Sequence, residues 1–216
     1  MAQIFCFGDS ITYGAWDVVN SGWAQKLRIY LDKKQEEDSS LYFLIYNLGI
    51  PGETTDSLVN RFLPETKARI REDRQEENIF IFAYGANDSA AILSQNNFSV
   101  DVKDFKNNLK NTIDQAKNFG NKIFILNITP VNEELTANPV NKAKSRLNKY
   151  IEKYNQNIKE ISEDNGIYFV DVNSAFMNNN YKGLFCEDGL HPNEFGHEIM
   201  FNELLRVMKG VLDLKS

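Results

Sequence analysis

The sequence predicts a doubly wound α/β domain, in which a parallel sheet of five strands carries helices on both faces. Three observations predict it: short apolar runs of strand length, stretches of helical spacing between them, and no internal repeat or linker along the 216 residues. A single hydrophobic core can grow to about 250 residues before chains usually divide. We therefore expect one domain over residues 1–216.

Five apolar runs account for the strands. They are residues 4–7, 42–46, 79–84, 122–127 and 167–170. Runs that are apolar throughout, without alternation, are typical of parallel strands buried on both faces. Strands that alternate with helices build layered α/β structures of this kind.

The stretches between these runs repeat apolar residues at helical spacing. Such residues are Trp23, Leu27, Tyr30 and Leu31, then Phe105, Leu109, Ile113 and Ala116, then Leu147, Ile151, Tyr154 and Ile158. Residues 194–212 are expected to form a closing helix. The charged run 67–78 has the composition of a solvated helix face ahead of the third strand. Residues 89–100 and 131–141 lack a regular pattern, and we expect irregular segments that shape the substrate pockets.

The composition bounds the partners and the location. The chain is 42% apolar and 25% charged, which is ordinary for a globular protein, and its net charge is −6. No basic stripe predicts nucleic-acid binding, and no stretch approaches the roughly 20 apolar residues of a membrane span. Cys6 and Cys186 form neither a CxxC pair nor a disulfide framework. With no signal-peptide pattern at the start, we expect a cytoplasmic protein, and secretion after removal of a signal peptide remains an open alternative.

The unusual residues of the chain follow the predicted strands. In open parallel sheets, ligands bind outside the carboxyl ends of the strands. The segments GDSIT, NLGIPGET, GAND and DGLHPN, at residues 8–12, 47–54, 85–88 and 188–193, each follow one of the apolar runs. We expect them to share one rim of the sheet.

This rim supplies the groups that a serine hydrolase needs. A serine nucleophile requires a base for its proton, a group that orients the base, and donors for the oxyanion. His191 is one of two histidines and lies in a loop bounded by Gly and Pro, and Asp188 precedes it by three residues. A turn through Gly189 can place the carboxylate on one imidazole nitrogen while the other nitrogen faces Ser10. Ser10, Asp188 and His191 are therefore the candidate catalytic residues.

The candidate oxyanion donors are the backbone N–H groups of Ser10 and Gly52 and the side-chain amide of Asn87. Glycine permits close approach of the backbone to a ligand. A competing interpretation is that Ser10 merely caps the helix after the first strand. Asp9 is expected to organise the loop by accepting backbone N–H groups.

Other polar and aromatic residues have simpler interpretations. His197 lies inside the closing helix, where a packing or surface role is expected instead of a second base. Tyr13 and Trp16 either line an acyl pocket or pack in the core.

A carboxylate cluster holding Mg²⁺ for phosphoryl chemistry is a further alternative, built on Asp88 and Asp171. Such a phosphatase needs a second carboxylate soon after the first-strand aspartate, whereas Ser10, Ile11 and Thr12 follow Asp9. We therefore expect no metal site.

Taken in order, these motifs resemble the SGNH hydrolase superfamily, the GDSL-type lipases and esterases, over essentially the whole chain. Ser10 lies in the first block, Gly52 in the second, Asn87 in the third, and Asp188 and His191 in the fifth. The resemblance implies a flavodoxin-like, three-layer α/β/α sandwich, a serine nucleophile near the N-terminus, a broad ester range and no cofactor. The chain has no Gly-x-Ser-x-Gly elbow.

The resemblance leaves one donor and the substrate open. Gly49 is an alternative to Gly52 as the donor of the second block, and Gly52 is favoured because the family's Gly-Asp-Thr pattern aligns with residues 52–54. Residues 89–100 and 131–141 contain no long hydrophobic lid, so a small soluble ester is expected over a triglyceride. The alternatives are a carbohydrate O-acetylesterase, a lysophospholipase-like activity, a binding module that has lost catalysis, and a metal-dependent phosphatase.

Overall fold

The centre of the molecule is a five-stranded parallel sheet. The computed structural model describes residues 1–71, 76–95, 97–120, 122–137 and 143–212. The strand order is β2-β1-β3-β6-β8, with β1 (Ala2–Gly8), β2 (Phe43–Gly49), β3 (Glu77–Ala83), β6 (Lys122–Leu126) and β8 (Tyr168–Val170). Each strand lies on one of the five apolar runs, so the predicted fold class is confirmed.

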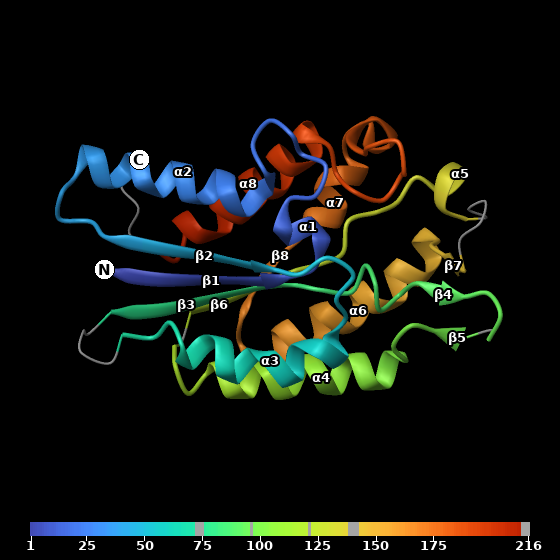
Figure 1. Cartoon of the computed structure of the whole chain (residues 1–216), viewed down its shortest axis with the longest axis horizontal. Helices are drawn as coiled ribbons and strands as arrows, with labels where there is room; N and C mark the ends of the chain where they lie inside the picture. The colour runs from blue at the N-terminus through green and yellow to red at the C-terminus, as the bar shows by residue number, and fades with distance from the viewer. Residues whose placement is uncertain (72–75, 96, 121, 138–142, 213–216) are drawn as a thin grey trace.

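Helices cover both faces of this sheet (Figure 1). On one face α2 (Gly22–Glu37) packs against α8 (Glu194–Lys209), and α7 (Val172–Met177) contacts α8. On the other face lie α3 (Thr55–Lys67), α4 (Val102–Ala116) and α6 (Asn148–Asn165). Within the described ranges, no helix combines the length and the apolarity needed to cross a membrane.

The core explains why the strand runs are apolar without alternation. Both faces of β1 and β3 are covered, and the phenylalanines of the two strands stack in pairs. The ring centroids of Phe5 and Phe80 are 5.1 Å apart and those of Phe7 and Phe82 are 5.9 Å apart. Phe62 of α3 packs against Phe7, Phe80 and Phe82. The sheet is therefore a rigid platform whose strand ends hold the loops of the site.

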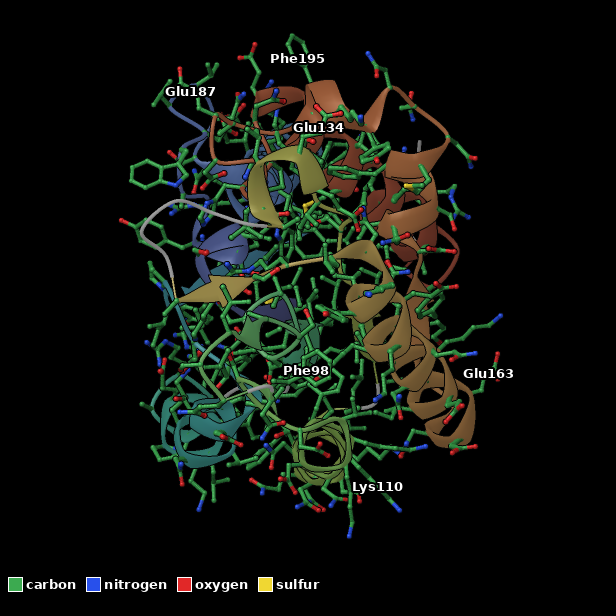
Figure 2. All side chains as sticks on the ribbon, turned by 90° about the vertical axis from the view of Figure 1, so that its right-hand side faces the viewer. Phe98, Lys110, Glu134, Glu163, Glu187 and Phe195 are labelled. Carbon is green, nitrogen blue, oxygen red and sulfur yellow. The ribbon has the colours of Figure 1, made fainter. Side chains whose placement is uncertain are left out.

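The carboxyl ends of the strands carry small elements that the sequence did not predict. Figure 2 looks onto this end of the molecule. A three-stranded antiparallel sheet, in the order β5-β4-β7, is formed by β4 (Ala91–Ile92), β5 (Asn97–Phe98) and β7 (Lys144–Ser145). The short helices α1 (Ser10–Tyr13) and α5 (Glu133–Thr136) and a 3-10 helix (Tyr181–Leu184) lie at the same end.

Two predictions of irregular segments were therefore wrong in part. The segment 89–100 contains β4 and β5, and the segment 131–141 contains α5. Strands of two residues are too short to show an apolar alternation, which is why the sequence pattern missed them. Residues 96 and 138–141 of these segments lie outside the described residues.

The prediction of a helix face over residues 67–78 was also wrong. The helix α3 ends at Lys67, and β3 begins at Glu77. The side chain of Gln3 in β1 donates to the carbonyl of Arg69 at 2.9 Å and accepts from the N–H of Arg71 at 3.3 Å. These bonds hold the chain in a non-helical course after α3, and residues 72–75 lie outside the described part.

Candidate active site

Ser10 is placed by a tight turn at the end of β1. A side chain at Gly8 would put its Cβ 2.0 Å from Thr12 Oγ1, so the turn requires glycine there. The carboxylate of Asp9 accepts the N–H of Ile11 at 2.9 Å and caps α1. The expected loop-organising role of Asp9 is confirmed. Ser10 becomes the first residue of α1, and its hydroxyl is left for another partner.

The structure brings Ser10, His191 and Asp188 into one hydrogen-bonded chain. Ser10 Oγ lies 2.8 Å from His191 Nε2, and His191 Nδ1 lies 2.5 Å from Asp188 Oδ2. Asp188 Oδ1 accepts the backbone N–H groups of Leu190 and His191, each at 3.0 Å. Gly189 turns the chain between them at a φ of +71°, a conformation that glycine adopts without strain.

The protonation states of this chain follow from its contacts. Burial by itself would raise the pKa of Asp188, but the hydrogen bonds from the His191 ring and from two backbone N–H groups hold that pKa well below its usual range. An ionised carboxylate can only accept hydrogen bonds, so a neutral His191 that pairs with Asp188 carries its proton on Nδ1. Nε2 is then the acceptor for the Ser10 hydroxyl, which is the arrangement of a general base.

The loop that carries His191 is anchored on both sides. The backbone N–H of Asn132 donates to the carbonyl of Gly189 at 2.8 Å, and the N–H of Cys186 donates to the carbonyl of His191 at 2.8 Å. The segment after β6 is therefore hydrogen-bonded to the loop that carries His191. Sequence reasoning did not assign this role to Asn132, because nothing in its motif marks it.

The second and third strand loops bring the candidate oxyanion donors to the same place. Asn87 Nδ2 donates to the carbonyl of Glu53 at 3.0 Å, and Asp9 Oδ2 lies 3.5 Å from the same nitrogen. Gly52 has a φ of +80° and no atom within 4 Å of the position that a Cβ would take. Among the described residues, no acceptor takes the N–H of Gly52 or of Ser10.

The two glycines of the second loop have different surroundings in the structure. Gly49 ends β2, and a Cβ there would lie 2.2 Å from the backbone nitrogen of Tyr13. Gly52 lines the cavity above Ser10, whereas Gly49 does not. Of these two glycines, Gly52 is therefore the one that lies at the cavity beside Ser10.

A cavity of about 430 Å³ opens beside the Ser10 hydroxyl. It is lined by Ser10, Tyr13, Gly14, Ala15, Trp16, Pro51, Gly52, Asn87, Arg146, Leu190 and His191. Tyr13 and Trp16 are 57% and 64% exposed, so they line the cavity and do not pack in the core. Arg146 was not predicted as a site residue, because it enters from the segment after β7, where no strand-end motif marks it.

A partly buried arginine fixes the loop that carries Gly52. Arg61 of α3 forms an ion pair with Glu53, and its guanidinium also donates to the carbonyl of Leu48 at 2.7 Å and to Tyr84 Oη at 2.7 Å. Tyr84 Oη in turn donates to Glu53 Oε2 at 2.6 Å. The ends of β2 and β3 and the loop between β2 and α3 are thus tied together at one side chain.

The aspartates near the site have separate roles. Asp88 accepts both the N–H and the hydroxyl of Thr55, at 2.9 and 2.6 Å, while Asp171 caps α7. Burial raises the pKa of Asp9 to about 7 and that of Asp88 to about 6. The described part of the chain contains no group of three or more His, Cys, Asp or Glu side chains that could hold a metal ion.

The second histidine is a packing residue, as predicted. His197 is fully buried in α8, and its Nδ1 accepts the N–H of Trp23 at 3.3 Å. Burial lowers its pKa to about 4. It joins α8 to the start of α2 and does not line the cavity beside Ser10.

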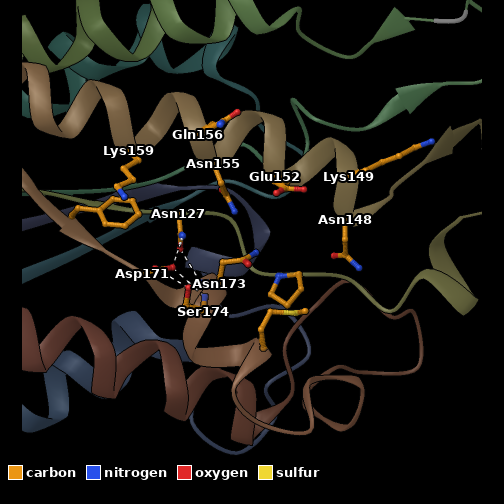
Figure 3. Close-up of a pocket in the computed structure, with 13 residues that line it drawn as sticks. Asn127, Asn148, Lys149, Glu152, Asn155, Gln156, Lys159, Asp171, Asn173 and Ser174 are labelled. Atoms are coloured by element: carbon orange, nitrogen blue, oxygen red, sulfur yellow. Dashed lines mark hydrogen bonds between the residues drawn. The ribbon is translucent and has the colours of Figure 1, made fainter.

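A second cavity, of about 480 Å³, lies between α6 and α7 (Figure 3). The asparagine side chains that line it already form hydrogen bonds within the protein. Asn148 and Asn155 of α6 pair with the backbone N–H and carbonyl groups of Val131 and Ile128, and Asn127 donates to Asp171 at 2.7 Å. These side chains hold the segment that leads to Asn132, and so they serve the loop of His191.

Known proteins are similar to this chain in fold and in sequence. A solved lipase/acylhydrolase from Enterococcus faecalis superposes with a TM-score of 0.75 at 22% identity, and all of both chains is covered. The acetylxylan esterase Axe2 from Geobacillus stearothermophilus gives a TM-score of 0.71 at 19% identity, covering 96% of this chain and 94% of Axe2. The GDSL esterase/lipase WDL1 from Oryza sativa subsp. japonica is 23% identical over 94% of this chain and 76% of its own length. A sequence model of the GDSL-like lipase/acylhydrolase family matches residues 6–199, and the chain belongs to that family.

Proposed function

We propose that the protein is a serine esterase that cleaves carboxylic esters of small acyl substrates through Ser10, His191 and Asp188. The observation that carries the proposal is the unbroken chain from Ser10 Oγ to His191 Nε2 at 2.8 Å and from His191 Nδ1 to Asp188 Oδ2 at 2.5 Å. Membership of the GDSL-like lipase/acylhydrolase family supports it.

The chemistry would proceed through an acyl-enzyme. Ser10 Oγ attacks the ester carbonyl carbon while its proton passes to His191 Nε2, and Asp188 stabilises the imidazolium that forms. His191 then gives this proton to the departing alcohol oxygen as the carbon–oxygen bond breaks. Water, deprotonated by His191, then attacks the acyl carbon, the bond from this carbon to Ser10 Oγ breaks, and His191 returns the proton to Oγ as the acid leaves.

The negative oxygen of each tetrahedral intermediate needs donors that are in place before the reaction. We assign this role to the backbone N–H groups of Ser10 and Gly52 and to Asn87 Nδ2. The free space at Gly52 lets a substrate oxygen come close to the backbone. The second N–H of Asn87 has only the 3.5 Å contact with Asp9, which is at the limit of a hydrogen bond, so it can turn to an oxyanion.

A carbohydrate O-acetylesterase is the second candidate. Trp16 and Tyr13 are exposed beside the cavity, and an aromatic ring offers an apolar face against which a sugar ring can pack. The structural likeness to the acetylxylan esterase Axe2 adds to this candidate. The two candidates use the same nucleophile and differ only in the alcohol that leaves.

The test is hydrolysis of p-nitrophenyl acetate, butyrate and octanoate by the wild type and by Ser10→Ala, each with and without EDTA. We expect turnover that EDTA does not change and that Ser10→Ala abolishes, with the highest kcat/KM on the short esters. Ser57→Ala, an exposed serine of α3, is the matched control and should keep full activity.

Two outcomes would count against the proposal. Activity that survives in Ser10→Ala would show that Ser10 is not the nucleophile. Activity that EDTA abolishes would favour the metal-dependent alternative. Release of acetate from acetylated xylo-oligosaccharides at a higher kcat/KM than from p-nitrophenyl acetate would favour the carbohydrate esterase.

A further inference from the structure

Arg146 is a cation in the active-site cavity, and none of the described residues pairs with it through a carboxylate. It lines the cavity together with Ser10 and His191. Within the described ranges its guanidinium donates only to two neutral oxygens, the carbonyl of Ala86 at 3.3 Å from Nε and Asn87 Oδ1 at 3.2 Å from Nη2. Nη1 donates to no residue of the described part. A guanidinium has five N–H groups, so most of its donors are left for a ligand.

The lack of a counter-charge is unusual for a cation in this position. Partly buried charges are normally paired, as Arg61 is, which forms ion pairs with both Glu53 and Glu65. No carboxylate among the described residues is within ion-pairing distance of Arg146. Burial lowers the pKa of Arg146, and the charges of Asp9 and Asp188 oppose this only from a distance.

The two carboxylates in the neighbourhood are already engaged. Asp188 accepts from the His191 ring and from two backbone N–H groups. Asp9 accepts the N–H of Ile11 and lies 3.5 Å from Asn87 Nδ2. Asp188 cannot turn to Arg146 without giving up the bonds that hold the His191 loop, and the Asp9 carboxylate is held by its bond to the N–H of Ile11.

Arg146 is held in this position by the backbone around it. Its N–H donates to the carbonyl of Thr136 at 3.0 Å, and its carbonyl accepts the hydroxyl of Thr136 at 2.9 Å. The side chain is therefore presented to the cavity from a fixed point between β7 and α6. It lies against the same Asn87 that we assign to the oxyanion.

We propose that Arg146 binds a carboxylate of the substrate, so that the preferred substrates are esters with an anionic group a short spacer away from the scissile bond. This proposal rests on the proposed esterase function and adds the class of substrate to it. A guanidinium matches a carboxylate by two parallel N–H···O bonds. Contact with Asn87 places that carboxylate close to the carbonyl that Ser10 attacks.

The test compares esters of equal size with and without the charge. Monomethyl glutarate is paired with methyl glutaramate for an anion on the acyl side, and acetoxyacetate with acetoxyacetamide for an anion on the alcohol side. We expect the wild type to prefer the charged member of at least one pair by about 10- to 100-fold in kcat/KM, the range given by hydrogen bonds to a charged group. Arg146→Met should lose this preference and Arg146→Lys should keep part of it. Lys144→Met, a neighbouring cation that does not line the cavity, should leave it unchanged.

A binding measurement makes the outcome independent of turnover. Glutarate should bind to the wild type and to Ser10→Ala in a calorimetric titration, and its affinity should fall at least 10-fold in Arg146→Met. Unchanged glutarate binding in a folded Arg146→Met would overturn the proposal, even if no ester is cleaved. An equal loss of kcat/KM for both members of each pair would also overturn it, because Arg146 would then act only by holding Asn87.

Discussion

The amide of Asn87 has one N–H group to give to a substrate. The other donates to Glu53, and the amide oxygen accepts from Arg146. We expect Asn87→Ala to lower kcat on p-nitrophenyl acetate by about 100-fold or more, the usual cost of one oxyanion donor, with a smaller change in KM. Asn118→Ala, an exposed asparagine of the same amide chemistry, is the control. A kcat unchanged in Asn87→Ala would remove this residue from the oxyanion site.

Residues of the site could be predicted where they follow a strand of the parallel sheet. Ser10, Gly52 and Asn87 follow β1, β2 and β3, whereas His191 lies in the loop before α8, separated from β8 by α7 and the 3-10 helix; the structure brings all four to one cavity. The role of Tyr13 and Trp16 could not be chosen from sequence, since an aromatic residue near a loop fits a core or a cavity equally well. Arg146 could not be predicted as a site residue, because it follows β7 and no strand of the parallel sheet. Only the folded structure shows that its side chain lines the cavity.

At the scale of elements, one arginine ties α3 to the ends of three strands. Arg61 contacts Gly8, Leu48, Glu53 and Tyr84, which belong to or follow β1, β2 and β3. Removing one member of a buried ion pair leaves the other charge without a partner, at a cost of about 3–5 kcal/mol. We expect this loss in the free energy of unfolding of Arg61→Met, measured with urea, together with lower kcat because the Gly52 loop loses its anchor.

The matched control for Arg61 is an exposed ion pair. Arg206 pairs with Glu203 on the surface of α8, where such pairs contribute about 1 kcal/mol or less. Arg206→Met should therefore unfold close to the wild type. Equal effects of Arg61→Met and Arg206→Met would show that the Arg61 cluster has no special role.

The buried His197, which joins α8 to α2, should make the stability of the protein depend on pH. Burial lowers the pKa of His197 to about 4 from the 6.5 of an unperturbed histidine. Between these values the unfolded chain binds a proton that the folded chain does not, so the free energy of unfolding falls as the pH falls from about 6.5 to about 4. This contribution is on the order of 2 kcal/mol between pH 7 and pH 5.

His197→Gln removes this titration and is the test. Its free energy of unfolding, compared with that of the wild type by urea denaturation at both pH values, should depend less on pH by about that amount. An identical pH dependence in the two proteins would show that His197 does not titrate in this window.

The large elements were predictable and the small ones were not. Strands such as β1 and β3 are buried on both faces, so their sequences are apolar over five or more residues and stand out. The helices α4 and α6 show their buried stripes at regular spacing. The sheet β5-β4-β7 has strands of two residues, which no pattern can reveal, and the course of residues 68–71 depends on contacts with Gln3 across the fold.

At the scale of the whole molecule, we predict that residues 1–216 unfold as one cooperative unit. The two tryptophans report on different regions, since Trp23 is fully buried beneath α8 and Trp16 is exposed at the cavity. In Trp16→Phe, the fluorescence of Trp23 and the far-UV circular dichroism should give coincident urea transitions. Separate transitions would indicate two units in the chain.

The most direct test of the whole account is covalent capture of the nucleophile with diethyl 4-nitrophenyl phosphate. Attack by Ser10 Oγ on phosphorus releases one p-nitrophenol and leaves a diethylphosphoryl group that resists hydrolysis. We expect one such group per chain, found on Ser10 by peptide mass spectrometry, absent in Ser10→Ala, and formed far more slowly in His191→Ala. A label on another residue, or equal labelling of Ser10→Ala, would contradict it.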